Sequence, residues 1–188
     1  MTSQDAKRPP RGGAPVSAAA LRWGVVALVV VIALVAWLAT RGGGSGSSGP
    51  PPQFLSQAEL IQAAKGASPP IYWAGAAVNA EYELREVEGG HQVLYVPAGE
   101  HSEAASTRAL TVGSYPLADP EAEIEAIAER PGAIVRHASD GREVVSSRRD
   151  LSSVYFVAPE GEVEIEVYAP APGRALRLAL SGRVRPVR

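Results

Sequence analysis

The stretch that decides the fold is EYELREVEGGHQVLYV, residues 81–96. Charged and apolar side chains alternate along its first half, and a period of two is typical of a β-strand with one buried face. Residues 88–91 (EGGH) have the composition of a tight turn, and residues 92–96 return as a second apolar strand. The stretch therefore predicts a β-hairpin in which Tyr82 and Leu84 share one face.

Further strands and helices are predicted around this hairpin. The strands are expected at residues 71–73, 108–115, 133–137, 142–146, 154–158, 162–168 and 183–187. Helices are expected at 56–65, 120–130 and 173–181, and residues 99–107 as a loop. Ser56 and Glu59 form a capping box, and Asp119 before Pro120 marks another helix start. The fold class is therefore α+β: a mostly antiparallel sheet with about three helices packed on one face.

One transmembrane helix is predicted before this domain, at residues 18–40. Trp23 to Thr40 is a run of 18 uncharged residues, and at about 1.5 Å per residue it covers about 27 Å, close to the hydrocarbon thickness of a bilayer. A cleaved signal peptide is the main alternative, but its apolar region is normally shorter, about 7–15 residues. Residues 1–17 are polar and rich in Pro and Gly, which predicts a disordered tail.

The remaining sequence predicts a tethered domain outside the cytoplasm. Residues 41–52 (RGGGSGSSGPPP) have linker composition, and residues 53–188 form the α+β domain. Basic residues before the span outnumber the single Arg41 after it, so the positive-inside rule places the N-terminus in the cytoplasm. The expected localisation is the cell membrane, as a single-pass signal anchor whose partner through residues 18–40 is the lipid bilayer.

Charge and composition narrow the classes of function. Residues 1–52 carry a net charge of +4 and residues 53–188 a net charge of −6. An acidic domain argues against nucleic acid as a partner. The chain has no cysteine, which excludes disulfides, thiol catalysis and Cys-ligated metals. There is no glycine-rich phosphate loop, so we predict no nucleotide. The sequence also has no metal-ligand motif, and we predict no metal and no cofactor.

Four aromatic residues are the candidate binding site. Tyr72, Trp73, Tyr95 and Tyr115 come from three predicted strands and can converge in the fold. Aromatic side chains of this kind pack most often in the core. The other interpretation is a groove for a peptide, a glycan or a partner strand.

Other reactive side chains are interpreted structurally. Glu162, Glu164 and Glu166 alternate along one strand, and we expect them on a solvated sheet face rather than as calcium ligands or an acid–base pair. The three histidines, at 91, 101 and 137, have no sequence partner that indicates a catalytic or metal role. Five arginines from Arg174 onward follow the last acid, and we expect them to pair with the acidic part of the domain.

Short apolar patches carry a resemblance to a protein family. The patches are IYWAG at residues 71–75, YEL at 82–84 and LTVGSYP at 110–116. They resemble uncharacterised single-pass membrane-anchored proteins of high-GC actinobacteria with a "YW.G…YEL…TVGTYP" type of extracytoplasmic domain. Ser114 stands where that pattern has Thr. The resemblance implies an envelope location and brings no catalytic residue.

The sequence as a whole favours a binding or scaffolding domain of the bacterial cell envelope, without catalysis, whose partner is an envelope protein or a glycan. One alternative is an envelope hydrolase whose site is assembled from distant residues. Another is a cytosolic regulatory module, if the topology is inverted.

Overall fold

The computed structural model describes residues 53–87 and 89–188. The chain divides into two units between Ser47 and Ser48, and every described residue belongs to the second. The predicted tail, span and linker (residues 1–17, 18–40 and 41–52) lie outside the described residues. Within the described part, every helix is too short or too polar to cross a bilayer.

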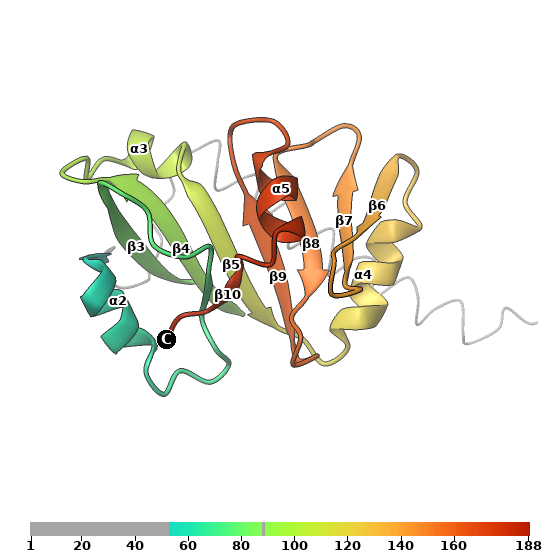
Figure 1. Ribbon diagram of the computed structural model, residues 1–188, viewed down its shortest axis with the longest axis horizontal. Helices are drawn as coiled ribbons and strands as arrows, with labels where there is room; N and C mark the ends of the chain where they lie inside the picture. Colours follow the sequence, from blue (N-terminus) through green and yellow to red (C-terminus); the bar gives the residue numbers. More distant parts are fainter. Residues whose placement is uncertain (1–52, 88) are drawn as a thin grey trace, which may run out of the picture. The chain divides into compact units, whose positions relative to one another are not determined.

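The predicted α+β class with a mostly antiparallel sheet is confirmed (Figure 1). Eight strands form one sheet in the order β1-β3-β4-β5-β9-β8-β7-β6, and all paired neighbours run antiparallel. A two-stranded sheet pairs β10 with β2. The strand bounds are β1 Gln53–Leu55, β2 Tyr72–Trp73, β3 Ala80–Val87, β4 Gly90–Pro97, β5 Leu110–Pro116, β6 Ala133–His137, β7 Glu143–Ser147, β8 Ser153–Val157, β9 Val163–Tyr168 and β10 Arg185–Pro186.

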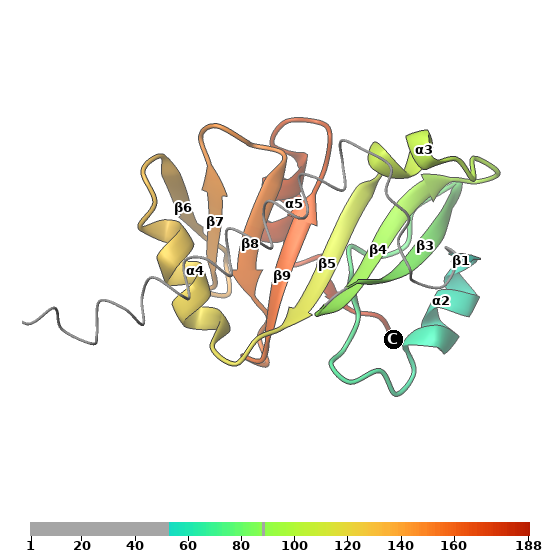
Figure 2. The ribbon, with the colours of Figure 1, turned by 180° about the vertical axis from the view of Figure 1, so that it is seen from behind.

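Four short helices accompany the sheet in the described part, one more than predicted. Their bounds are α2 Gln57–Ala64, α3 Glu103–Thr107, α4 Pro120–Ala128 and α5 Arg174–Leu180. The expectation that the helices pack on one face is wrong. α5 lies in front of β8 and β9 in Figure 1, whereas α4 lies in front of the sheet when it is turned by 180° in Figure 2. Both helices contact β7 and β8, so they cover opposite faces of the same strands.

The larger core lies on the sheet face that α5 covers, which we call the front face. Strand alternation places Val112, Val167 and Val154 on this face, where the cross-strand register brings them side by side. Ala175 and Ala179 of α5 are fully buried against it, because small side chains allow the helix a close approach. The layer of chain over the front face also includes β2 and β10.

Two helix N-termini form the caps that the sequence predicts. Ser56 Oγ accepts from the backbone N–H of Glu59, and the Glu59 carboxylate accepts from the N–H of Ser56, so both halves of the capping box form. Asp119 caps α4 by accepting from the N–H of Ala122 at 3.0 Å. Two elements were missed: β1, and α3 within the stretch predicted as a loop.

Candidate ligand-binding pocket

Three of the four predicted aromatic site residues lie in the core. Tyr72, Trp73 and Tyr95 have relative exposures of 1 %, 4 % and 9 %, and all belong to the cluster on the front face. Tyr82 links two of them: its ring lies 5.7 Å from the Trp73 ring and 5.1 Å from the Tyr95 ring, both edge to face. The structure therefore packs Trp73, Tyr82 and Tyr95 as one aromatic cluster, whereas the hydroxyl of Tyr72 donates to the Glu160 carboxylate.

The hydroxyl of Tyr95 holds the segment that follows β2. It accepts from the N–H of Ala74 at 2.7 Å and donates to the carbonyl of Gly75 at 3.0 Å. Burial raises the pKa of Tyr95 far above its usual value, so the phenol stays neutral. Tyr95 is therefore a structural hydrogen-bonding residue whose ring also reaches a surface pocket described below.

The remaining predicted residue, Tyr115, lies on the opposite face of the sheet. Its side chain is half-buried, and its hydroxyl accepts from Gln92 Nε2 at 2.8 Å. The ring lies over Gly113, where an added Cβ would come within 2.6 Å of it. Strand alternation explains the separation, because Tyr115 and the inward-facing Val112 are an odd number of residues apart on β5.

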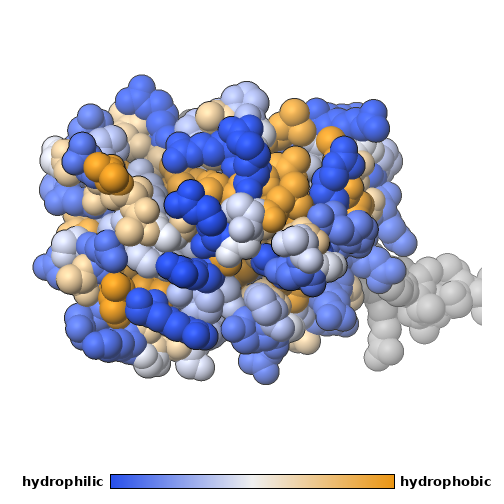
Figure 3. All heavy atoms as spheres, viewed as in Figure 1, coloured by the Kyte–Doolittle hydropathy of each residue, from blue (hydrophilic) through white to orange (hydrophobic). Residues whose placement is uncertain are grey.

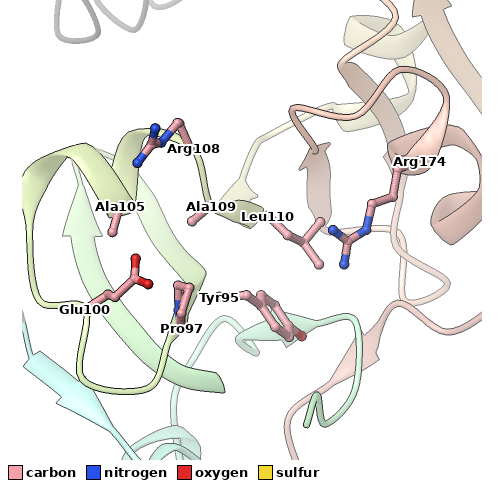
Figure 4. Close-up of a pocket in the computed structure, with 8 residues that line it drawn as sticks. All are labelled: Tyr95, Pro97, Glu100, Ala105, Arg108, Ala109, Leu110 and Arg174. Atoms are coloured by element: carbon pink, nitrogen blue, oxygen red, sulfur yellow. The ribbon is translucent and has the colours of Figure 1, made fainter. Parts of the chain in front are cut away.

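A surface pocket of about 290 Å³ lies between α3 and the start of α5 (Figure 4). Its apolar part comes from the end of β4 and from the chain around α3. Figure 4 shows Arg174 reaching toward Leu110 and Tyr95 from one side, with Arg108 and Glu100 on the side of α3. The lining residues are Tyr95, Pro97, Glu100, Ala105, Arg108, Ala109, Leu110 and Arg174.

The two arginines give the pocket its positive charge. Arg108 follows α3 and is exposed, and its Nε donates to the carbonyl of Ala104 at 3.2 Å. Arg174 is the first residue of α5 and is also exposed. Within residues 53–87 and 89–188, neither arginine forms an ion pair. Two unpaired guanidinium groups beside an apolar floor are suited to an anionic ligand.

The helix that builds this pocket could be found only in part from the sequence. Ser102 caps α3 by accepting from the N–H of Ala105 at 3.2 Å, and a Ser before an acidic residue is a recognisable start signal. The decisive contact is tertiary: Ser106 Oγ donates to Glu83 Oε2 at 2.5 Å. Glu83 on β3 is fully buried and also accepts from Arg85 Nε, so it fastens α3 to the sheet.

The expectation of a solvated glutamate row on β9 is wrong for two of its members. Glu166 is only 7 % exposed and accepts from Ser153 Oγ at 3.1 Å and from the Tyr155 hydroxyl at 3.2 Å. Glu164 is half-buried, because it lies on the face that α4 covers. Glu162 precedes β9 and is exposed, as expected. In the described part of the chain, no cluster of His, Cys, Asp and Glu is suited to a metal.

The histidines lie apart from the pocket lining. His101 Nε2 lies 2.6 Å from Glu81 Oε2, and its ring stacks on Phe54 with centroids 4.1 Å apart. This contact joins the loop before α3 to β3 and β1. His91 is half-buried on β4, and His137 is exposed at the end of β6. The geometry of the histidines is that of structural and surface residues.

Comparisons with known proteins identify no relative. No family model, no curated protein and no solved structure matches this chain.

Proposed function

We propose that this chain is a single-pass, membrane-anchored binding domain of the bacterial envelope that holds a small carboxylate-bearing ligand in the pocket at α3. The observation that carries the proposal is the pair of unpaired arginines, Arg108 and Arg174, beside the apolar floor that Leu110 and Tyr95 provide. Ligand sites typically combine such a floor with a few polar groups that orient the ligand.

The charge of the rim favours one class of ligand. A guanidinium donates two parallel hydrogen bonds to a carboxylate, which gives Arg108 or Arg174 a geometric preference for this group. Glu100 on the same rim opposes a doubly charged phosphate but can accept hydrogen bonds from hydroxyl or amide groups. A ligand with one carboxylate and several hydroxyls, such as a sugar acid, satisfies both sides of the pocket.

The chemistry of the lining supports binding rather than hydrolysis. Tyr95 supplies the one hydroxyl among the lining residues, and this group is occupied by Ala74 and Gly75. Burial raises its pKa, so it is a poor nucleophile at neutral pH. The lining contains no imidazole to act as a general base.

Replacing Arg108 with glutamine is expected to weaken the binding of a sugar acid about tenfold or more, because a charge-assisted hydrogen bond contributes about 1.5–3 kcal/mol. The measurement is calorimetric titration of the full chain in detergent with N-acetylmuramic acid. N-acetylglucosamine, which lacks the carboxylate, should bind at least tenfold more weakly. The matched variant Arg136→Gln removes an exposed arginine on β6, outside the pocket lining, and should leave binding unchanged. Equal binding of the two sugars, or of neither, contradicts the proposal.

The location of the domain has its own test, which uses the absence of native cysteine. A chain with Ser45→Cys in the predicted linker is expected to react with a membrane-impermeant maleimide in intact cells, because charge asymmetry places the linker outside. Wild-type chain provides the background, since it has no thiol. Labelling that appears only after lysis would place the domain in the cytoplasm and support the inverted topology.

A further inference from the structure

Two segments that lie over the front face are together strongly basic. We define the covering layer as residues 66–79, which include β2, and residues 169–188, which include α5 and β10. It contains five positive side chains and no Asp or Glu; the positive side chains are Arg174, Arg177, Arg183, Arg185 and Arg188. Residues 53–166 carry a net charge of −11, so the domain's weak overall charge conceals a strong separation.

These arginines point to solvent because the apolar residues between them point inward. Val184 and Val187 are buried in the front-face core, and Ala175 and Ala179 anchor α5. All five arginines are exposed. In the part of the chain that the structure describes, none of them forms an ion pair, so the expectation that they pair with the acidic part of the domain is wrong. The acid that contacts this layer, Glu160, accepts instead from the Tyr72 hydroxyl on β2.

The opposite face has the opposite charge. α4 carries acidic side chains at Glu121, Glu123 and Glu125, and Glu129 follows as its C-cap. Arg130 lies beside Glu123, with the nitrogen and oxygen 3.9 Å apart. The basic α5 and the acidic α4 therefore lie on opposite faces of the sheet (Figures 1 and 2).

The covering layer also presents an apolar loop. Val78 is 90 % exposed, and Ala76 and Ala77 beside it are exposed as well. Two core hydroxyls hold this loop in place: Tyr95 binds Ala74 and Gly75, and the Tyr82 hydroxyl accepts from the N–H of Ala77 at 3.0 Å. In the space-filling view of this side, hydrophilic residues cover most of the surface and apolar residues are exposed in patches between them (Figure 3). The loop follows β2, which pairs with Arg185 of β10, and an apolar contact combined with basic residues is the pattern of a membrane-interface contact.

We infer that the covering layer lies against the anionic headgroups of the membrane that anchors the chain; this inference rests on the proposed anchor. Each arginine near an anionic surface contributes about 1 kcal/mol of attraction, and the exposed Val78 adds an apolar contact at the headgroup boundary. The predicted linker is only 12 residues long, and a short tether raises the effective concentration of the layer over the lipid. The anionic lipid surface repels the acidic side chains of α4, and this repulsion also turns the covering layer toward the membrane.

A membrane surface fits the layer better than an acidic protein does. The arginines are distributed over α5 and the C-terminal segment rather than gathered in one cleft, and a lipid surface presents charge over a broad plane. An acidic protein would bind the exposed Val78 only if it also offered an apolar pocket. The nanodisc experiment distinguishes an acidic protein partner from a lipid surface.

The experiment places the full chain in nanodiscs and measures the depth of one fluorophore. A label on Ser181→Cys, exposed next to α5, reports on the covering layer, and a label on Ala126→Cys, exposed on α4, reports on the opposite face. The discs contain either phosphatidylcholine alone or an added fraction of phosphatidylglycerol, with a headgroup quencher in both. The label at Ser181 should be quenched several-fold more in anionic discs, the label at Ala126 should not, and high salt should abolish the difference.

Matched double variants test whether the arginines of the covering layer hold the domain on the lipid. Arg183→Gln with Arg185→Gln should lower the ratio of docked to free domain about 30-fold, from about 1 kcal/mol per arginine. Arg148→Gln with Arg149→Gln removes the same charge from an exposed loop outside the layer and should have little effect. Equal effects of the two double variants, or quenching that is the same in both kinds of disc, overturn the inference. Loss of quenching on adding polyglutamate, without any lipid dependence, overturns it in favour of an acidic protein.

The controls separate this inference from the proposed function. Failure of the chain to co-elute with neutral discs shows that the anchor is absent, whereas co-elution without lipid-dependent quenching contradicts the docking alone. Neither Arg183 nor Arg185 lines the pocket, so the sugar-acid titration remains an independent test of ligand binding.

Discussion

Replacing Tyr82 with alanine is expected to destabilise the domain by about 3–5 kcal/mol, the usual cost of deleting a buried aromatic ring. Tyr82 is 1 % exposed and touches the rings of both Trp73 and Tyr95. The variant leaves a cavity at the centre of the aromatic cluster and frees the N–H of Ala77. The measurement is urea unfolding of the full chain in detergent, followed by circular dichroism of the sheet.

The matched variant Tyr82→Phe separates packing from hydrogen bonding. It keeps the ring and removes only the hydroxyl that binds Ala77, so a loss of about 1 kcal/mol is expected. A small effect of Tyr82→Ala would contradict a core role for the cluster. In that case Tyr72, Trp73 and Tyr95 would return as candidates for a groove that opens on this face.

Replacing Glu164 with glutamine is expected to stabilise the domain by about 3 kcal/mol at pH 8. Glu164 lies on β9, on the face that α4 covers, and burial raises its pKa from 4.5 to about 7. The charges of Glu123 on α4 and of Glu166 on β9 act in the same direction, and Arg130 opposes them. Tyr155 on β8 is the neutral neighbour, since burial and Glu166 raise the pKa of its phenol. Glutamine reproduces the neutral form that the folded chain prefers.

The pH dependence follows from the direction of this shift. Between pH 4.5 and 7 the folded chain keeps the proton on Glu164 while the unfolded chain releases it, so stability falls as pH rises through this range. The loss is complete above pH 7 and amounts to about 1.36 kcal/mol for each pKa unit. Urea unfolding at pH 5 and pH 8 should show this decline in the wild type and a smaller one in Glu164→Gln. Glu162→Gln, at an exposed position before β9, should retain the decline; an equal decline in Glu164→Gln would contradict the assignment.

Local signals predicted most of the elements of this fold. Alternation located the hairpin of β3 and β4, and the capping box at Ser56 and the Asp119-Pro120 pair located the starts of α2 and α4. These signals work because they depend on residues within one turn or one strand. β1 and α3 were missed since three and five residues carry too little periodicity, and α3 depends on the distant Glu83.

The candidate site could be predicted from the sequence only in small part. The sequence named Tyr95 as a site residue, and Tyr95 does line the pocket. The three residues predicted with it do not: Tyr72 and Trp73 are core residues, and Tyr115 lies on the other face of the sheet. Arg108 and Arg174 are 66 positions apart and carry no mutual signal in the chain. Only the return of α5 across the sheet brings them to one pocket.

The sequence alone determined the α+β class and the antiparallel hairpins, because each follows from local composition and period. The division into tail, span, linker and domain stays a prediction. The tertiary structure decided which face each helix covers, the burial of Glu164 and Glu166, and the free arginines of the covering layer. These properties depend on contacts between residues far apart in the chain. Distant residues that become neighbours in the fold decide which side chains are buried and which charges are paired, and the local sequence pattern does not identify these residues.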